Sequence, residues 1–518
     1  MPRPDGSLRS YTLAAPTGGI DGVSTLFDMP ENRAIDIVDG VCEPYGIRSR
    51  NDARSTYLSV TGSSSQPAGT AGELIAADGS SDPFVIMRDR FKEANTDTAR
   101  TGSLTITSEY WRYVQYKYRI FAVNGTDQPF DWQGDGNNAA ATSWSGTSLT
   151  ITDLWNVSTY AGELVFLEKG TFGWWVPTDA IGAITGAMTF YDIQEYSSKG
   201  GQLCDLAQLS FGTDNFTSQY MCFLSDQGEL FVYYGDTPTD MSILGRFDLS
   251  PPVGEGLHAF VPVEGDLFVI TTTGMISVKE LVRGEPREQY TLSAPFEKQW
   301  LETVGLATTD YQGIWYPDRN YVLIVKLSAA GTTALCYNRT TQGWSTFEII
   351  NGAGTHSSWF YSKAARSVVL VLGVAANYPM IYFDPPDSVA PDSDYVELLI
   401  KHSFSSLGTS KDVKKSLLQI KPHIEIEGDA AYTPAQVEIF IDKDYEVSDS
   451  YVAGSGTALG LVFADGKSVW SKKKDCIGEG EVFSIVLKID FWESGTAAPW
   501  ARVRYLGSTL YFREDGEA

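Results

Sequence analysis

The sequence predicts an all-β protein: a β-propeller of six to eight blades with an N-terminal arm and a C-terminal β-sandwich domain. One observation is a repeated pattern in which turn residues precede a buried run of strand length. A second is the composition, since 13% aromatic residues and 49 Gly among 518 residues are typical of a folded, turn-rich β protein. A third is a shift in composition after residue 384, which separates two β regions.

The clearest copy of the repeat covers residues 162–176, where Gly162 opens a turn, 163–168 form an apolar run and Gly170 precedes an aromatic run. Glycine supplies the backbone angles that such turns need. Similar patterns start at residues 72, 117, 162, 228, 265, 319 and 365, with a mean spacing of about 49 residues, which falls in the range of repeat architectures. The pattern predicts that the following residues are buried in blade strands: Leu164, Val165, Leu230, Phe231, Leu267 and Phe268.

Four segments follow from this pattern. Residues 1–55 lack the repeat and form an arm, with a strand expected over 34–38 because apolar and acidic residues alternate there. Residues 56–384 form the propeller, and the acidic, Pro-rich residues 385–394 form a linker. Residues 395–518 contain about six strand-length runs without helical periodicity, which indicates a sandwich.

Aromatic residues cluster at the start of one predicted blade. Trp111 and Tyr113 fall on one strand face, and Tyr116 and Tyr118 fall on the other. Such rings could stack on a sugar or a base, but rings on both faces favour packing between neighbouring blades.

Charge and reactive residues restrict the function. The 39 Lys and Arg against 65 Asp and Glu give a net charge of −26, which argues against wrapping nucleic acid by neutralising phosphates. The five cysteines contain no C-x-x-C pair, and the four histidines show no metal-ligand spacing. We therefore predict no catalytic residue, metal or cofactor, and the sequence shows neither a signal peptide nor an apolar run of membrane-spanning length.

An ordered set of short motifs resembles the tail nozzle (tail hub, tail tubular) proteins of short-tailed bacteriophages. These motifs are Ala15-Pro16-Thr17-Gly18-Gly19, Met29-Pro30, residues 43–50, residues 123–129 with Trp132, residues 167–170 before Trp174, residues 199–201 and residues 337–345. They occur in the order of the family and extend from residue 11 to about residue 345.

The resemblance implies a non-enzymatic, structural virion protein assembled in the host cytoplasm. It would form the distal nozzle of the tail as a homo-hexameric ring, docked on the head-to-tail connector, with tail fibres or a tail needle as further partners. Double-stranded DNA would pass through the lumen during ejection without sequence-specific contact. The alternative from another class is a propeller-type carbohydrate-binding protein or glycoside hydrolase.

Two sets of charged residues are the site candidates under the nozzle hypothesis. The charge excess and the resemblance together predict acids that face the lumen and repel the DNA; the candidates are Asp28, Glu31, Asp384, Asp387, Asp392 and Asp394. A basic patch that could meet an acidic neighbouring subunit, or be a solvated face, is formed by Lys411, Lys414, Lys415 and Lys421.

Overall fold

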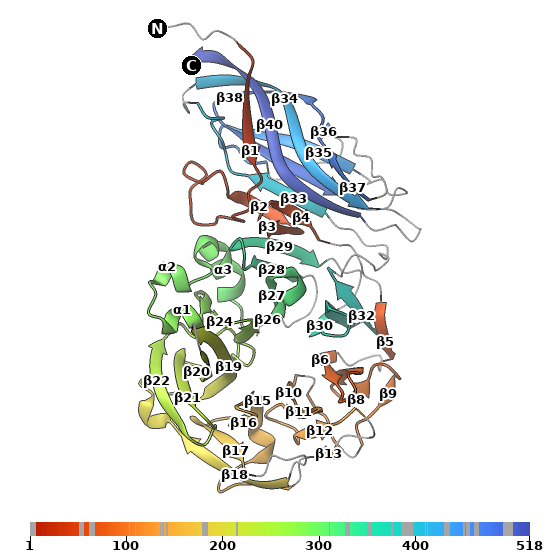
Figure 1. The fold of residues 1–518 in the computed structure, drawn as a ribbon, viewed down its shortest axis with the longest axis vertical. Helices are drawn as coiled ribbons and strands as arrows, with labels where there is room; N and C mark the ends of the chain where they lie inside the picture. The colour runs from red at the N-terminus through yellow and green to blue at the C-terminus, as the bar shows by residue number, and fades with distance from the viewer. Residues whose placement is uncertain are drawn as a thin grey trace.

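The computed structural model describes residues 7–517 except 51–55, 62–67, 103, 109, 135, 137–138, 141–142, 179–184, 214–215, 310, 327–331, 350–354, 374–376, 385–396, 410, 412, 429–435, 449–450, 452–455, 460–465 and 491–500. In the described residues, the strands form eight sheets: seven of them contribute the blades of a ring, one of these seven continues into the C-terminal region, and the eighth lies beside that continuation at one side of the ring (Figure 1). The all-β propeller predicted from the sequence is confirmed.

The blades follow one another along the chain, each built outward from an inner strand. The first four are β6 to β9 (Ala68–Ile75, Ser81–Met87, Arg90–Glu93, Thr98–Ala99), β10 to β13 (Arg112–Tyr116, Arg119–Val123, Phe130–Trp132, Ala139–Ala140), β14 to β18 (Ser143–Ser145, Leu154–Tyr160, Glu163–Glu168, Gly173–Pro177, Thr185–Asp192) and β19 to β22 (Leu203–Thr213, Phe216–Ser225, Glu229–Gly235, Met241–Asp248). The fifth is β23 to β25 (Phe260–Val263, Asp266–Thr271, Gly274–Ser277), and the sixth is β26 to β29 (Tyr311–Tyr316, Tyr321–Lys326, Thr332–Asn338, Gly343–Ile349). The seventh is β30 to β32 (Thr355–Ser362, Ser367–Gly373, Asn377–Phe383) together with β5 (Thr56–Thr61).

The ring closes through hydrogen bonds between the two ends of the propeller segment. Strand β5, which precedes the first blade in the chain, pairs antiparallel with β32 of the last blade. Inner strands of neighbouring blades contact each other around the ring, including β30 with β6. Radial repetition of blades leaves only short, protected strand edges, and it brings residues from distant parts of the sequence to the axis.

The fifth described blade has three strands, and three short helices follow it where the sequence analysis expected only strands. These are α1 (Val278–Val282), α2 (Arg287–Tyr290) and α3 (Glu297–Trp300). The side chain of Ser277 accepts a hydrogen bond from the backbone N–H of Glu280, which caps α1. The helices lie between this blade and the next and, as Figure 1 shows, at the side of the ring that faces the arm.

The C-terminal strands and the arm form two sheets. Their strands are β1 (Arg9–Ala14), β2 (Ala34–Val38), β3 (Gly40–Glu43), β4 (Gly46–Ser49), β33 (Glu397–His402), β34 (Val413–Gly428), β35 (Gln436–Lys443), β36 (Thr457–Ala458), β37 (Gly466–Trp470), β38 (Lys474–Gly480), β39 (Phe483–Asp490) and β40 (Ala501–Glu517). Inward residues from both sheets, such as Ile424 and Val503 in one and Ile400 and Leu487 in the other, belong to one hydrophobic core. After residue 395 the structure describes eight strands, where the sequence analysis expected about six strand-length runs.

The arm connects the propeller to these sheets. Strand β2 pairs with β33 on one side and meets β29 of the sixth described blade at Val38 and Thr346 on the other. Strands β1 and β4 pair with β40. One sheet of nine strands therefore runs from the blade into the C-terminal region.

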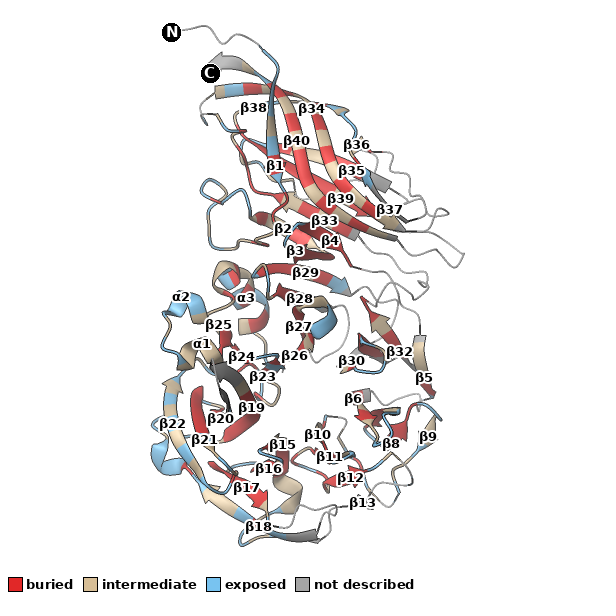
Figure 2. Cartoon of the chain, viewed as in Figure 1, coloured by how far each residue is buried: buried red, intermediate tan, exposed pale blue. Residues whose placement is uncertain are grey.

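The seven sequence patterns fall in seven different blades, although not at equivalent positions. The pattern at residue 72 lies in β6, the inner strand of its blade, whereas the pattern at 228 leads into β21, the third strand. The predicted core positions Leu164, Val165, Leu230, Phe231, Leu267 and Phe268 are all buried. Burial is concentrated in the middle strands of the blades, as Figure 2 shows.

Candidate functional site

A pocket of about 260 Å³ lies at the axis of the propeller. Its walls come from β6, β10, β23, β26 and β30, or from residues directly before these strands, so that five inner strands contribute to one cavity. We call it the axial pocket. The residues that line it are Gly69, Thr70, Ala71, Trp111, Arg112, Tyr113, His258, Phe260, Pro262, Gln312, Gly313 and Ser358.

The guanidinium group of Arg112 is held in the wall of the axial pocket by three partners. Its Nε donates to Oδ1 of Asn156 at 3.1 Å, and its Nη2 donates to Oδ1 of Asp205 at 3.2 Å. Its Nη1 lies 2.6 Å from Nδ1 of His258. The Arg112 side chain remains 22% exposed, whereas Asp205 is fully buried behind it. The network therefore fixes the orientation of one partly accessible cation.

Asp205 accepts hydrogen bonds from several members of this network through both of its carboxylate oxygens. Its Oδ1 also accepts from Nδ2 of Asn156 at 2.8 Å and from the backbone N–H of Leu206 at 2.9 Å, and its Oδ2 accepts from the N–H of Phe260 at 2.8 Å. Burial raises the pKa of Asp205 to about 6, against the lowering effect of Arg112 and of these donors. At neutral pH the carboxylate is mostly ionised, so the charges of Asp205 and Arg112 cancel.

His258 is a neutral partner of Arg112 in the lining of the pocket. Burial, reinforced by the charge of Arg112, lowers the pKa of His258 well below its ordinary value. Because a guanidinium group can only donate, Nδ1 of His258 must accept, which places the ring hydrogen on Nε2. Gln312 supplies the opposite function, since its Nε2 donates to the carbonyl of Trp359 and leaves its Oε1 as an acceptor.

The axial pocket has no carboxylate in its lining. Glycoside hydrolysis commonly uses two Asp or Glu side chains on either side of the bond that is broken, and here the nearest carboxylate in the network, Asp205, is fully buried behind Arg112. The described residues also contain no group of three or more His, Cys, Asp or Glu side chains placed to hold a metal ion. The chemistry of the lining fits binding of a polar ligand between apolar walls.

The aromatic residues noted in the sequence pack within and between blades, and two of them also line the axial pocket. Trp174 of β17 stacks on Phe223 of β20 in the next blade, with ring centroids 4.7 Å apart. Trp111 packs on Phe130 at 5.0 Å and also lines the axial pocket together with Tyr113. Packing between blades therefore explains Trp174, whereas Trp111 and Tyr113 are also in the lining of the axial pocket.

The acids predicted to face a lumen have different environments. Asp384 is fully buried, and it accepts two hydrogen bonds from Arg48, at 2.9 and 2.8 Å, and one from the Tyr321 hydroxyl at 2.9 Å. The prediction that Asp384 faces a channel is therefore wrong, because a buried carboxylate must pair with a cation. Asp28 and Glu31 are exposed; Asp387, Asp392, Asp394 and the predicted linker 385–394 lie outside the described residues.

The predicted basic patch does not form one surface. Lys415 is fully buried and donates to the carbonyls of Val413 and Glu481, so its place in an exposed patch is wrong. Lys414 lies 3.4 Å from Glu479, and Lys411 donates to the carbonyl of Phe27 and covers its ring. Each of these three lysines is bound within its own chain, and Lys421 is half-buried.

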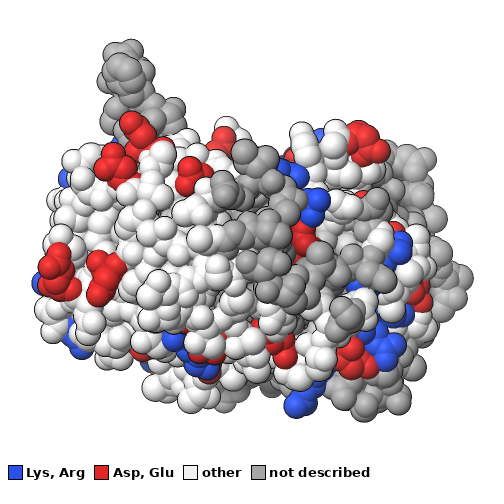
Figure 3. Space-filling model, turned by 90° about the horizontal axis from the view of Figure 1, so that it is seen from below, with Lys and Arg blue, Asp and Glu red and all other residues white. Residues whose placement is uncertain are grey.

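Charged residues of both signs occur on the rim of the propeller at the end of the molecule opposite the C-terminal sheets, as Figure 3 shows for the described residues. None of the described helices is long and apolar enough to cross a membrane. All five cysteines are buried and free of disulfide bonds.

Sequence reasoning did not find the axial network. His258 was one of four histidines without metal spacing, and Arg112 and Asp205 belong to no motif. The only signal was indirect, since Arg112 sits between the two aromatic residues Trp111 and Tyr113 that the analysis had noted.

Comparisons with known proteins find similarity at low sequence identity. No family model and no curated protein matches the chain. Among solved structures, similarity is found to an exo-β-1,3-galactanase from Phanerochaete chrysosporium with galactose, at 9% identity over 77% of this chain and 95% of that one, with a TM-score of 0.26. BBS1N in complex with ARL6 shows 11% identity over 67% and 98%, with a TM-score of 0.37, and the C-terminal WD40 domain of Sif2 shows 10% over 61% and 81%, with a TM-score of 0.33.

These comparisons correct the predicted tail nozzle. No family model and no curated protein supports a phage tail nozzle, and the solved structures named above are a galactanase, BBS1N and a WD40 domain. The hexameric ring, the connector partner, the passage of DNA and the virion location were implied by the same resemblance, and a single chain tests none of them. The similarity is too remote to assign a function, which must be argued from the pockets of the chain itself.

Proposed function

We propose that this protein is a non-catalytic carbohydrate-binding propeller that holds one neutral sugar unit in its axial pocket. The observation that carries the proposal is the Arg112 network, in which a partly exposed guanidinium group is fixed by buried partners and its charge is balanced by Asp205. A fixed, neutral set of donors suits hydroxyl groups better than it suits an anion, which would need an uncompensated positive charge.

The rest of the lining supports a sugar as the ligand. Arg112 and Nε2 of His258 are donors, and Oε1 of Gln312 is an acceptor, so the pocket can match hydroxyl groups that both donate and accept. Tyr113 and Phe260 provide apolar walls against which the C–H face of a sugar ring can pack. The volume of about 260 Å³ is at the small end for ligand sites, which favours a single unit over an extended chain.

The absence of a carboxylate from the lining favours binding over hydrolysis. A hydrolase would need one carboxylic acid to protonate the leaving oxygen and a second carboxylate to act as nucleophile or base. Asp205 has a raised pKa, as a general acid would, but Arg112 and Asn156 occupy one of its oxygens and the N–H of Phe260 occupies the other. Asp205 is therefore a positioning residue for Arg112.

The test is calorimetric titration with a panel of neutral sugars, including galactose, glucose and N-acetylglucosamine, together with hydrolysis assays on the matching nitrophenyl glycosides. We expect saturable binding of at least one sugar, little dependence on salt because the ligand is uncharged, and no hydrolysis. The variant Arg112→Lys keeps the charge opposite Asp205 but loses the planar fork of donors, and we expect affinity to fall about tenfold or more.

Arg119→Lys is the matched control. Arg119 is also a partly buried arginine paired with a buried carboxylate, Asp131, and it lies in the adjacent strand of the same blade but does not line the axial pocket. Its replacement should leave sugar affinity unchanged. The proposal fails if no sugar of the panel binds, or if Arg112→Lys binds as well as Arg119→Lys does. Hydrolysis of any glycoside that is lost on Asp205→Asn would instead identify an enzyme.

A further inference from the structure

The net charge of the axial pocket depends on one carboxylate behind its wall. Arg112 is the only residue of the described lining that carries a permanent charge. Its Nη2 lies 3.2 Å from Oδ1 of the fully buried Asp205, and it forms no ion pair with another carboxylate of the described residues. The pocket is therefore neutral while Asp205 is ionised, and it has one uncompensated positive charge once Asp205 takes up a proton.

Two neutral side chains hold Arg112 whatever the charge of Asp205. Its Nε donates to Oδ1 of Asn156 at 3.1 Å, and its Nη1 lies 2.6 Å from Nδ1 of His258. Burial and the charge of Arg112 lower the pKa of His258 well below its ordinary value, so this ring stays neutral when the medium becomes mildly acidic. Protonation of Asp205 therefore changes the charge of the network and leaves the guanidinium group oriented toward the pocket.

The elements that surround Asp205 on β19 supply polar groups but no second charge. Strand β15 contributes the amide of Asn156, and β23 contributes the backbone N–H of Phe260. On β20, Leu224 is the residue paired with Asp205, and its carbonyl accepts from the thiol of Cys204. Arg112 and His258 are thus the charged and titratable partners of this network.

Other titratable groups on the strands packed against β19 are bound elsewhere or stay neutral. The buried carboxylate of Glu168 on β16 accepts from Nε1 of Trp175, and that of Asp266 on β24 accepts from the Ser277 hydroxyl at 2.6 Å. Burial raises the pKa of the Cys222 thiol on β20, so this thiol remains protonated. The charge of Arg112 is therefore controlled by Asp205 alone.

The proton on Asp205 exchanges within an ordinary range of pH. Burial raises the pKa of Asp205 to about 6, against the lowering effect of Arg112 and of the hydrogen-bond donors. Asp205 is then mostly ionised above about pH 7 and mostly protonated below about pH 5. A sugar carboxylate with an ordinary pKa of about 3–4 remains ionised over this whole range.

We propose that the axial pocket binds a uronic acid when Asp205 is protonated, in addition to the neutral sugar that it binds when Asp205 is ionised. This inference rests on the proposed sugar binding and adds a second ligand class to the same site. Arg112 then binds the ligand carboxylate through planar N–H donors whose charge Asp205 no longer balances. A uronic acid has a carboxylate in place of the terminal CH₂OH group of a hexose, so it fits the same volume of about 260 Å³.

Binding of a uronic acid and protonation of Asp205 must be coupled. A ligand that binds the protonated form more tightly raises the affinity of Asp205 for its proton by the same factor. At pH 7.5, where Asp205 is mostly ionised, binding of the uronic acid should therefore take up as much as about one proton per site. A neutral sugar has no charge to favour either form, so its binding should take up far less.

The test is calorimetric titration of the full chain with galactose, glucose, galacturonate and glucuronate at pH 7.5 and pH 5, at one ionic strength. We expect the affinity for at least one uronate to rise about tenfold or more at pH 5, because the fraction of protonated Asp205 rises by at least that factor. The affinity for a neutral sugar should change less than about threefold. Titrations at pH 7.5 in two buffers with different enthalpies of ionisation count the protons taken up.

The variant Asp205→Asn imitates the protonated carboxyl at every pH. It should bind the uronate at pH 7.5 about as tightly as the unmodified chain does at pH 5, without dependence on pH and without proton uptake. Asp131→Asn is the matched control, since Asp131 is also a buried carboxylate paired with an arginine, Arg119, but neither residue lines the axial pocket. This control should keep the pH dependence of the unmodified chain.

The inference is overturned, and the proposed function kept, if a neutral sugar binds at pH 7.5 and the affinity for both uronates is the same at pH 5. It is also overturned if Asp205→Asn keeps the pH dependence, or if Asp131→Asn loses it as well. Uronate binding at pH 5 with no binding of a neutral sugar at pH 7.5 would contradict the proposed function and support the role of Asp205. Circular dichroism shows whether each variant is folded, and proton uptake by the unmodified chain keeps the test available if Asp205→Asn is not.

Discussion

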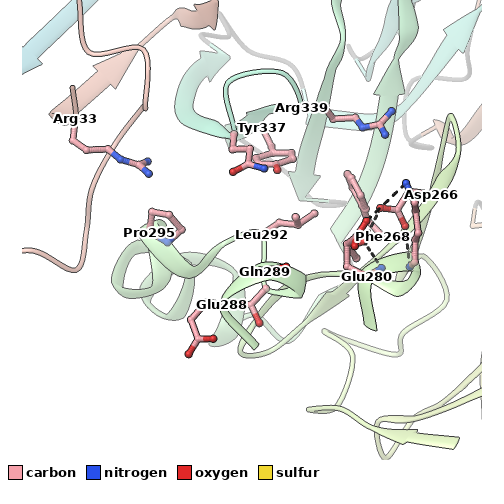
Figure 4. Close-up of a pocket in the computed structure, with 14 residues that line it drawn as sticks. Arg33, Asp266, Phe268, Glu280, Glu288, Gln289, Leu292, Pro295, Tyr337 and Arg339 are labelled. Carbon is pink, nitrogen blue, oxygen red and sulfur yellow. Dashed lines mark hydrogen bonds and ion pairs between the residues drawn. The ribbon is translucent and has the colours of Figure 1, made fainter. Parts of the chain in front are cut away.

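The propeller presents arginine to two cavities, but it holds the arginine in opposite ways. In the axial pocket, three neighbours fix Arg112, and the buried carboxylate of Asp205 balances its charge. In a cavity of about 420 Å³ that Arg33 and Arg339 line (Figure 4), which is called the junction pocket here, neither arginine forms an ion pair with a described residue: each donates to a backbone carbonyl, and Arg339 also covers the ring of Trp315 at 5.2 Å. The first arrangement is part of the fold, and the second leaves charge and donors available.

This difference distinguishes an arginine that stabilises the fold from an arginine whose charge and donors remain available. A buried carboxylate needs its cation, so removing Arg112 leaves an uncompensated charge inside the protein. When an arginine without such a partner is removed, no buried carboxylate is left unpaired. Stability measurements on the free protein should therefore separate the two pockets before any ligand is identified.

The largest effect is expected for Arg112→Met, which leaves Asp205 buried without its cation. We expect a loss of about 3–5 kcal/mol in the free energy of unfolding, measured by urea denaturation at pH 7. The double variant with Asp205→Asn removes the buried charge and should recover part of the loss. Arg246→Met is the control: Glu229 is also fully buried, but hydroxyl and backbone donors of residues 197–199 satisfy it, so the loss should stay below about 1 kcal/mol. Equal losses for the two variants would contradict the comparison.

The pH dependence of the free energy of unfolding should report the protonation of Asp205. Its pKa is raised from 3.8 to about 6 in the folded chain, so the folded state binds this proton more tightly than the unfolded state does. The stability that this proton contributes is fully present below about pH 4 and is lost as the pH rises through 6, a change of about 3 kcal/mol. Asp205→Asn should remove this component from the difference between unfolding free energies at pH 4 and pH 7. An unchanged pH profile in that variant would place the proton on another group.

The propeller could be predicted from the sequence because its signals are local. A turn residue followed by a buried run, as at Gly228 before Leu230 and Phe231, marks a strand wherever it occurs, and one such mark falls in each described blade. The three short helices after β25 interrupt this pattern, and nothing local distinguishes the inner strand of one blade from the third strand of another. The repeat therefore predicted the architecture but not the position of each strand in its blade.

The site could not be predicted, because ring closure creates it. Arg112 and His258 are 146 residues apart, and they meet only because inner strands of different blades converge on the axis. Asp384 is a second residue whose environment depends on distant parts of the chain. Its acidic, Pro-rich surroundings indicated a solvated linker, but it is buried in an ion pair with Arg48, 336 residues away. Local composition describes the neighbours in sequence, and burial is decided by the neighbours in space.

A smaller effect is expected for Arg339→Gln in the free protein. The change removes the hydrogen bond to the carbonyl of Glu264 and the contact with the Trp315 ring, but it leaves no carboxylate unpaired. We expect a loss of about 1 kcal/mol in the free energy of unfolding, well below the loss for Arg112→Met. A loss as large as that of Arg112→Met would mean that Arg339 also compensates a buried charge, which would remove the distinction between the two pockets.

The smallest effect is expected for Tyr337→Phe, and it gives the sharpest contrast. The Tyr337 hydroxyl, on a residue that lines the junction pocket, makes no hydrogen bond to a described residue, so its removal should change the free energy of unfolding by no more than about 0.5 kcal/mol. Tyr160→Phe is the matched change in another blade, where the hydroxyl donates to the carbonyl of Gly235 at 2.7 Å and accepts from its N–H at 3.1 Å. There we expect a loss of about 1–2 kcal/mol. Urea denaturation of both variants at pH 7 completes the comparison. If Tyr337→Phe costs as much as Tyr160→Phe, the Tyr337 hydroxyl is already satisfied within the protein.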